Sequence, residues 1–176
     1  MAKELQMIRT KWVDRKFSFN IPKGWLFNIL TRLEGTIVRL KSLTNTLSDE
    51  QLSEKPNSEW SIKEHIGHLL DLEELHLGRV YDFIDRKTIL SAADMSNQQT
   101  NTANHNDTEL AELIGLFSTK RYFFMKALKN LDDTTQEFVS MHPRLQEKMK
   151  PVDIAFFTAE HDDHHIASIS SIIRSL

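Results

Sequence analysis

Apolar residues recur every three to four positions along most of this chain, the period of an α-helix with one buried face. The pattern predicts four long helices, at about residues 22–47, 61–84, 107–131 and 151–176. Pro22 and Pro151 suit the first turns of the first and last helices, because proline needs no backbone N–H there. Four long amphipathic helices in one chain predict an all-α, four-helix bundle.

Two short patterns mark helix starts. Ser48 with Gln51, and Ser61 with Glu64, have the spacing of a capping box, in which two side chains bond reciprocally to free backbone N–H groups. The first box predicts a short helix, and the second opens the second long helix. A further short helix is predicted after Pro143.

The segment from Lys87 to Asn106 is polar and predicts a loop of about 20 residues, a length that is usually functional or mobile in a compact domain. This connection between the second and third long helices is long enough to cross the bundle, so a simple up-down-up-down order does not follow. We expect one domain over residues 1–176, with residues 1–20 as an N-terminal extension.

The composition excludes several classes of function. The net charge is -3, and without a basic surplus neither nucleic-acid nor anionic-membrane binding is expected. No apolar stretch suits a membrane span or a signal peptide, so a cytoplasmic protein is expected. The chain has no cysteine, which excludes disulfides, a cysteine-based zinc site and a catalytic thiol of its own. A thiol supplied as a substrate is not excluded.

Histidines are the candidate chemistry of this chain. Eight are present, at positions 65, 68, 76, 105, 142, 161, 164 and 165. His161 and His165 lie four residues apart on the inward stripe of the last helix, a spacing that suits two ligands of one metal ion. The alternative is a hydrogen-bonded pair in the core or a water-lined crevice. His164 falls off the stripe and is expected at the solvated rim, while His105 and His142 are expected to be structural or exposed.

A third ligand would have to come from another helix. The segment KEHIGHLLDLEELH carries three candidates, and helical periodicity places His65 and His76 closer to the apolar stripe than His68. The residues alone leave this choice open.

Two stretches resemble the DinB/YfiT-like family. WSIKEHIGHLLDLEELHLGR, from Trp60 to Arg79, is similar to the family's second helix, with its tryptophan, serine cap, histidine, acidic and basic positions. MHPRLQEKMKPVDIAFFTAEHDDHHIASI, from Met141 to Ile169, is similar to the family's ending, an HP turn before a helix with HxxHH. The two motifs stand in order about ninety residues apart, which makes the resemblance more specific than either motif alone.

The resemblance implies a four-helix bundle that binds a divalent metal, usually zinc or nickel, through His68, His161 and His165. Family members are often homodimers, and some relatives are bacillithiol S-transferases or mycothiol-dependent isomerases. Many relatives carry Arg-Gly-Gln after the last histidine pair, where this chain reads HHIASI. The resemblance therefore implies a metal site without naming a substrate.

Three histidines leave a zinc-type ion with an open position, where a water or a thiol can be activated. We therefore expect a metal-dependent thiol S-transferase or hydrolase acting on a small-molecule substrate. The alternatives are a non-catalytic metal-binding stress or accessory protein, and a plain bundle with structural histidines.

Four further residues near the motifs have ordinary roles as their first interpretation. Glu73 is a candidate to orient a ligand or act as a general base, but an ion pair on a solvated face is the favoured interpretation. Trp60 is expected to pack at the helix start, and Asp162 and Asp163 to point sideways from the ligands.

Overall fold

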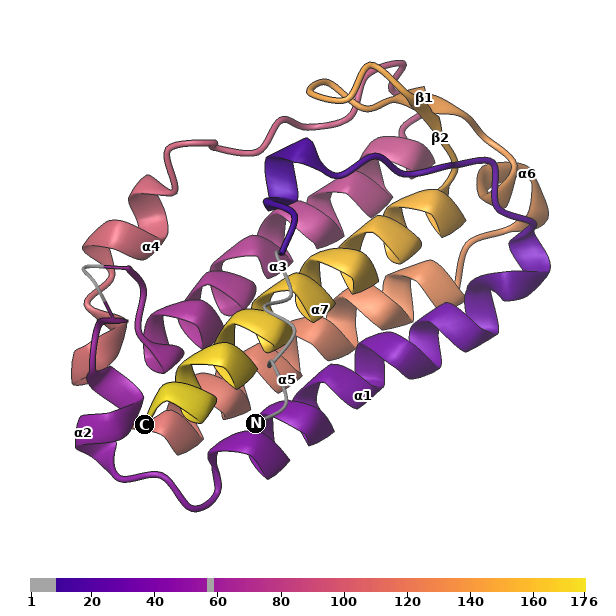
Figure 1. Cartoon of the computed structure of the whole chain (residues 1–176). Helices are drawn as coiled ribbons and strands as arrows, with labels where there is room; N and C mark the ends of the chain where they lie inside the picture. Colours follow the sequence, from indigo (N-terminus) through magenta and orange to yellow (C-terminus); the bar gives the residue numbers. More distant parts are fainter. Residues whose placement is uncertain (1–8, 57–58) are drawn as a thin grey trace, which may run out of the picture.

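A computed structural model describes residues 9–56 and 59–176 of the chain. Four long helices form the bundle, as the periodicity predicted (Figure 1). They are α1 (Leu26–Thr44), α3 (Ile62–Ile84), α5 (Leu110–Lys129) and α7 (Pro151–Ser175). A 3₁₀ turn, Lys23–Trp25, leads into α1, and another covers Trp12–Asp14. Within the described residues, no helix combines the length and the apolar character needed to cross a membrane.

The long helices α1 and α3 are consecutive in the sequence but are not neighbours in the bundle. α3 packs against α5 and α7, and α1 packs against the same two helices, so α1 and α3 lie on a diagonal. Glu73 on α3 contacts Arg121 on α5, and His76 contacts Phe124, at the same separation along the chain. A constant offset means that α3 and α5 run parallel (Figure 1).

Because parallel neighbours need a return along the bundle, residues 85–109 run outside it from the end of α3 to the start of α5 (Figure 1). This crossover contains the short helix α4 (Gln98–Thr102) and a 3₁₀ turn, His105–Asp107. The predicted long connection is confirmed, and with it a bundle that is not simply up-down-up-down.

Both predicted capping boxes are present. The Ser61 hydroxyl accepts from Glu64 N at 3.1 Å, and the Glu64 carboxylate accepts from Ser61 N at 2.9 Å. The same reciprocal pair between Ser48 and Gln51 starts the short helix α2 (Asp49–Ser53). Each box satisfies backbone N–H groups that a helix start leaves free.

The predicted short helix after Pro143 is wrong. A two-stranded antiparallel sheet, β1 (Ser140–Met141) and β2 (Lys148–Met149), follows the helical turn α6 (Asp133–Gln136), and residues 143–147 form the turn of its hairpin. His142 N donates to Glu147 O at 2.8 Å. Gln146 has a φ of 55°, a left-handed conformation that an α-helix does not accept.

The core contains two large apolar clusters with a charged layer between them, and a third, smaller cluster around Phe83 includes Met149 of β2. One large cluster surrounds Phe117 and the other surrounds Phe124. Between them, the Arg121 guanidinium donates to the carboxylates of Glu73 and Asp162, and the hydroxyl of Thr36 donates to Asp162 at 2.7 Å. Each of the four long helices contributes one residue to this layer.

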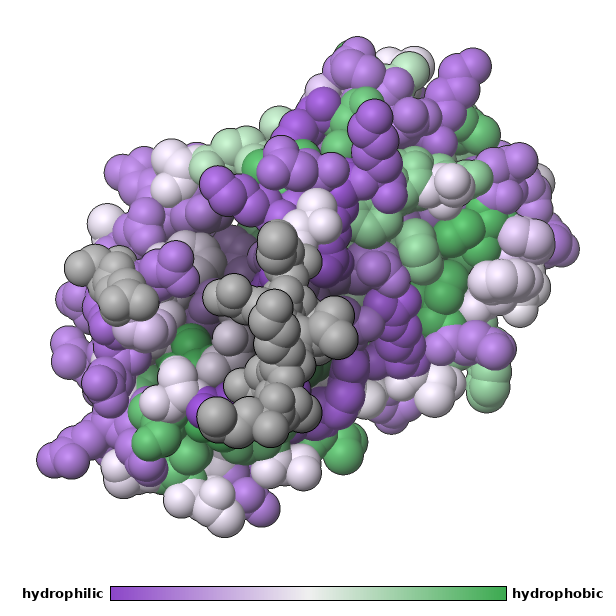
Figure 2. Space-filling view, in the orientation of Figure 1, coloured by the Kyte–Doolittle hydropathy of each residue, from purple (hydrophilic) through white to green (hydrophobic). Residues whose placement is uncertain are grey.

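The N-terminal segment lies across α7. Trp12 and Phe17 pack on Phe157, with ring centroids 5.0 and 5.4 Å away. Ile21 N donates to Asp153 at 2.8 Å, near the start of α7. Figure 2 shows this face as largely hydrophilic, with hydrophobic residues gathered over the adjoining starts of α1 and α7.

Candidate metal centre

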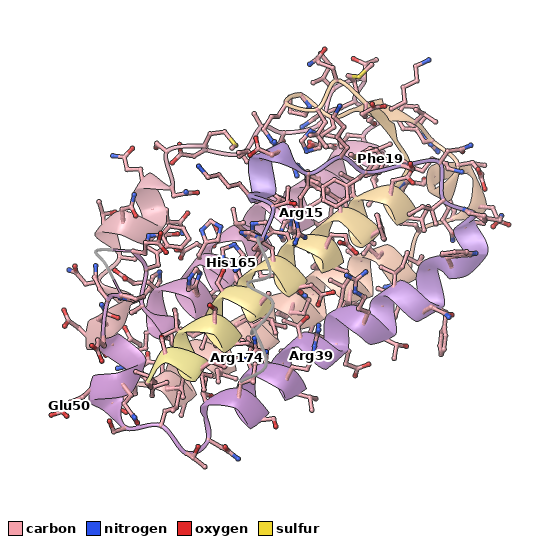
Figure 3. All side chains as sticks on the ribbon, viewed as in Figure 1. Arg15, Phe19, Arg39, Glu50, His165 and Arg174 are labelled. Carbon is pink, nitrogen blue, oxygen red and sulfur yellow. The ribbon has the colours of Figure 1, made fainter. Side chains whose placement is uncertain are left out.

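Three imidazoles meet where α3 and α7 pack side by side. His68 comes from α3, and His161 and His165 come from successive turns of α7. One ring nitrogen of each lies within 4.8 Å of the other two, and the Nε2 atoms of His161 and His165 are 3.2 Å apart. Figure 3 shows His165 on the side of α7 that faces α3. The four-residue spacing on α7 and the crossing of α3 thus bring three nitrogen donors together.

A chain of hydrogen bonds orients His68. Its Nδ1 lies 3.0 Å from the hydroxyl of Thr100, which in turn lies 2.8 Å from a carboxylate oxygen of Asp71. An ionised carboxylate only accepts, so the single hydroxyl proton of Thr100 goes to Asp71 and the hydroxyl oxygen accepts from His68 Nδ1–H. His105 Nε2 lies 2.9 Å from the same Asp71 oxygen. The lone pair of His68 is therefore on Nε2.

His165 is contacted from its other side. Its Nδ1 lies 2.9 Å from Nδ1 of His65, so a proton on His165 Nδ1 leaves its Nε2 lone pair directed toward His161. The Trp60 ring stacks on His165 at 6.1 Å and packs on His68 at 4.7 Å between centroids. These contacts hold the two rings in place.

Burial keeps the three imidazoles neutral. Desolvation lowers the pKa of His68 to about 4. Desolvation, followed by the neighbouring histidines, lowers the pKa of His161 and of His165 well below the ordinary value. A lowered pKa means that the lone pairs carry no proton at pH 7, which is the state that metal coordination requires.

A pocket of about 560 Å³ opens beside the histidines. Its walls are mostly apolar, and Leu72, Leu75 and Phe157 are among them. Crossover residues 92–95 form part of the wall, and His142 and Arg144 line the end nearest the β1–β2 hairpin. The cluster of three histidines therefore faces a cavity large enough for a small organic molecule.

The model of the DinB superfamily matches residues 32–169, which include α3, the crossover and the histidines of α7. The chain belongs to the DinB superfamily. The predicted resemblance is thereby confirmed.

Solved structures agree with this membership. The DinB chain shares 20% identity with YfiT from Bacillus subtilis, described as a probable metal-dependent hydrolase with an unusual four-helix bundle topology. The TM-score is 0.77, covering 92% of this chain and 93% of that one. A mycothiol-dependent maleylpyruvate isomerase matches with a TM-score of 0.66 and 8% identity, over 87% of this chain and 63% of that one. No curated protein sequence matches. At these identities the likeness shows the fold.

The donor set fits a divalent transition metal. Neutral imidazoles are common ligands of zinc, at about 2.0–2.1 Å from the ion. His68 Nε2 is freed by the contact of Nδ1 with Thr100. The Nε2 atoms of His161 and His165 lie 3.2 Å apart, a separation that suits two nitrogen ligands of one ion. The three side chains could hold such an ion with small movements of their rings.

The structure brings His68 into the cluster, as the resemblance implied, and not the two histidines that periodicity favoured. His65 contacts His165 from outside the cluster. His76 is buried deeper along α3, with its Nδ1 3.5 Å from the Thr158 hydroxyl. His68 is buried beneath Trp60. Trp60 lies outside α3, so the apolar stripe of that helix could not predict this burial.

Glu73 does not line the pocket. It forms an ion pair, as the favoured interpretation held, but the partner is Arg121 at 2.6 Å and the pair is fully buried and not solvated. Asp162 and Asp163 point away from the ligands as expected. Asp162 joins the buried charged layer, and Asp163 pairs with Arg39 at 2.6 Å.

Trp60 and the remaining histidines lie around the site. Trp60 packs at the helix start as expected, but it also lines the pocket. His105 and His142 are buried, and His164 is half-buried, with its Nδ1 2.8 Å from Arg9. The one sequence signal for the support of His68 was Asp71, three residues later on the same face of α3.

Proposed function

We propose that this DinB protein is a metal-dependent enzyme that acts on a small-molecule substrate, with zinc or nickel held by His68, His161 and His165. One observation supports the proposal above all others. Three neutral imidazoles converge at the wall of a pocket of about 560 Å³. A structural zinc site is normally closed by four protein ligands, whereas three ligands beside a cavity suit catalysis.

When bound, a divalent ion in this position would supply Lewis acidity, which lowers the pKa of a coordinated water or thiol. The protein residues have separate tasks. Asp71 and Thr100 keep His68 in the tautomer that presents Nε2. Trp60 and Phe157 cover the cavity with aromatic surface, which excludes water and orients an apolar substrate.

Two reaction classes are compatible with this site. A thiol S-transferase would use a low-molecular-weight thiol from outside, since the chain has no cysteine. A hydrolase would use water. The descriptions of YfiT and of the mycothiol-dependent isomerase support screening both classes. The competing proposal is a metal-binding protein without turnover.

The deciding experiment measures metal content by mass spectrometry on untagged protein. Wild type should carry close to one ion per chain, and His68→Ala and His161→Ala should lose it. His142→Ala is the matched control, because His142 lies in the β1–β2 hairpin and forms no hydrogen bond to the three histidines among the described residues. Wild type without metal after reconstitution with zinc, nickel and manganese would overturn the proposal.

A turnover screen then separates the enzyme from the accessory protein. The loaded protein is assayed with electrophile–thiol pairs and with ester substrates. Metal-dependent turnover that disappears in His161→Ala supports an enzyme and identifies its class. A fully loaded protein with no turnover in either screen favours metal binding without catalysis.

A further inference from the structure

Positive charge gathers where the pocket is lined by the last turns of α3 and by the β1–β2 hairpin. Arg79 lies three helical turns beyond His68 on α3, about 16 Å along the helix axis. His142 and Arg144 come from the β1–β2 hairpin, and all three side chains line the pocket. These three residues have no role in the proposed metal site.

Arg79 has a buried donor without an acceptor. Its side chain is only 3% exposed. Nε donates to Ser91 O at 2.9 Å, while Nη2 is buried and has no partner among the described residues. Asp82 is close enough to act on its charge, but both carboxylate oxygens of Asp82 already accept, from Lys87 Nζ and from Ser91 N. A buried guanidinium with an unused N–H is costly unless a ligand supplies the acceptor.

His142 adds a second unused donor. Leu145 N donates to His142 Nδ1 at 3.2 Å, so the ring proton is on Nε2. His142 Nε2 is buried and likewise has no partner among the described residues. Burial, followed by the charges of Arg79 and Arg144, lowers the pKa of His142 to about 4. At pH 7 it is a neutral N–H donor between two cations.

The pocket offers this group no free protein carboxylate. Among the described residues that line it, the only acidic one is Asp94. Asp94 Oδ1 accepts from the backbone N and the hydroxyl of Ser96, and Oδ2 accepts from Gln98 N. Two guanidinium groups and an imidazole N–H therefore face a cavity whose lining offers them no free carboxylate among the described residues.

We propose that Arg79, His142 and Arg144 bind the carboxylate of a small organic acid whose apolar body extends through the pocket toward His68. Arginine matches the planar, bidentate geometry of a carboxylate. The apolar walls, including Leu75 and Phe157, suit a hydrocarbon or aromatic body. Identifying this acid as the substrate rests on the proposed function, whereas the binding of the anion does not.

Calorimetric titration of the chelator-stripped full chain tests the proposal without any metal. The probes are 4-phenylbutyrate, the neutral 4-phenylbutanol and 4-phenylbutyl phosphate. Wild type should bind the acid at least tenfold more tightly than the alcohol. Equal affinities would overturn the proposal. Tighter binding of the phosphate than of the acid would overturn the assignment to a carboxylate.

Two variants test which residues cause the preference for the acid over the alcohol. Arg79→Gln and Arg144→Gln should each weaken binding of the acid about tenfold or more and leave the alcohol unchanged. Arg144 is half-buried in a turn, so this variant keeps the test decisive if Arg79→Gln fails to fold. Arg39→Gln is the matched control, because Arg39 pairs with Asp163 and does not line the pocket. An Arg144→Gln protein that retains the full preference would overturn the proposal.

One further variant separates this proposal from the metal site. His68→Ala should keep the preference for the acid, because Arg79, His142 and Arg144 bind the anion and His68 does not. Loss of the preference in His68→Ala would place the anion at the histidines and overturn the proposal. A chain that binds no metal yet prefers the acid would leave the anion site standing and overturn the proposed function alone.

Discussion

The hydroxyl of Thr100 lies 3.0 Å from Nδ1 of His68, although 32 positions separate the two residues in the chain. Thr100 belongs to α4 in the crossover, and His68 belongs to α3 in the bundle. A segment that appears as a polar loop in the sequence thus orients a candidate metal ligand, because Thr100 bonds both to His68 and to Asp71.

Thr100→Val should weaken metal binding by about 10–100-fold, the usual effect of losing a partner of a ligating histidine. Valine keeps the shape of threonine but cannot accept from Nδ1–H, so His68 is free to adopt the other tautomer. Competition with a chromophoric chelator measures the affinity. Thr102→Val is the control, since its hydroxyl contacts only the backbone of α4. Equal affinities for the two variants would contradict this role of Thr100.

Gly67→Ala should destabilise the protein by about 1–3 kcal/mol, because an added Cβ would overlap the imidazole ring of His105. Displacing His105 also removes its bond to Asp71. Urea unfolding measures the loss. Gly78→Ala on the same helix meets no atom within 4 Å and should stabilise by about 0.4–1 kcal/mol. If the contact is the cause, the double variant Gly67→Ala with His105→Ala should lose little more than His105→Ala alone.

Arg121→Met should cost about 3–5 kcal/mol, because it leaves the buried carboxylates of Glu73 and Asp162 without their common partner. Adding Glu73→Gln and Asp162→Asn should restore part of that loss by removing the uncompensated charges. Lys120→Met is the control, since its pair with Glu74 is exposed and is worth about 0–1 kcal/mol. Similar losses for Arg121→Met and Lys120→Met would contradict a buried layer held by charge.

Asp82→Asn should reduce stability more at pH 7 than at pH 3. Burial opposes ionisation of Asp82, but hydrogen bonds from Lys87 and Ser91 outweigh it and lower the pKa of the carboxyl. A lowered folded-state pKa stabilises the protein above the unfolded value of about 3.9, and that contribution disappears as the pH falls through the folded pKa. Urea unfolding of both proteins at the two pH values tests the sign. A constant difference would contradict the ionised contact.

The bundle could be predicted from the sequence because its evidence is spread over four long periodic segments and two capping boxes. The turn after Pro143 could not, since the conformation of residues 143–147 depends on the pairing of Ser140 with Met149. Helical periodicity describes each helix separately and not how helices pack together. It could therefore predict neither the parallel packing of α3 and α5 nor the burial of Glu73 against Arg121.

The candidate site shows the same limit more sharply. His161 and His165 could be paired from their spacing, because both lie on one helix. His68 required the resemblance, since the residues that cover and orient it, Trp60 and Thr100, lie outside the helix that carries it. The positive region of the pocket was missed altogether, because Arg79 and His142 meet only after the hairpin packs against the bundle.

The crossover is much longer than its topological task requires. α3 has 23 residues, about 34 Å of helix, which roughly ten residues of extended chain would retrace. Residues 85–109 therefore contain more than a dozen positions beyond the minimum, and these form the short helical turns and the pocket wall. Substitutions or length changes there could alter which molecules fit beside the histidines while the packing of the four helices stays the same. Part of the pocket wall is thus formed by a segment whose length the topology of the bundle does not dictate.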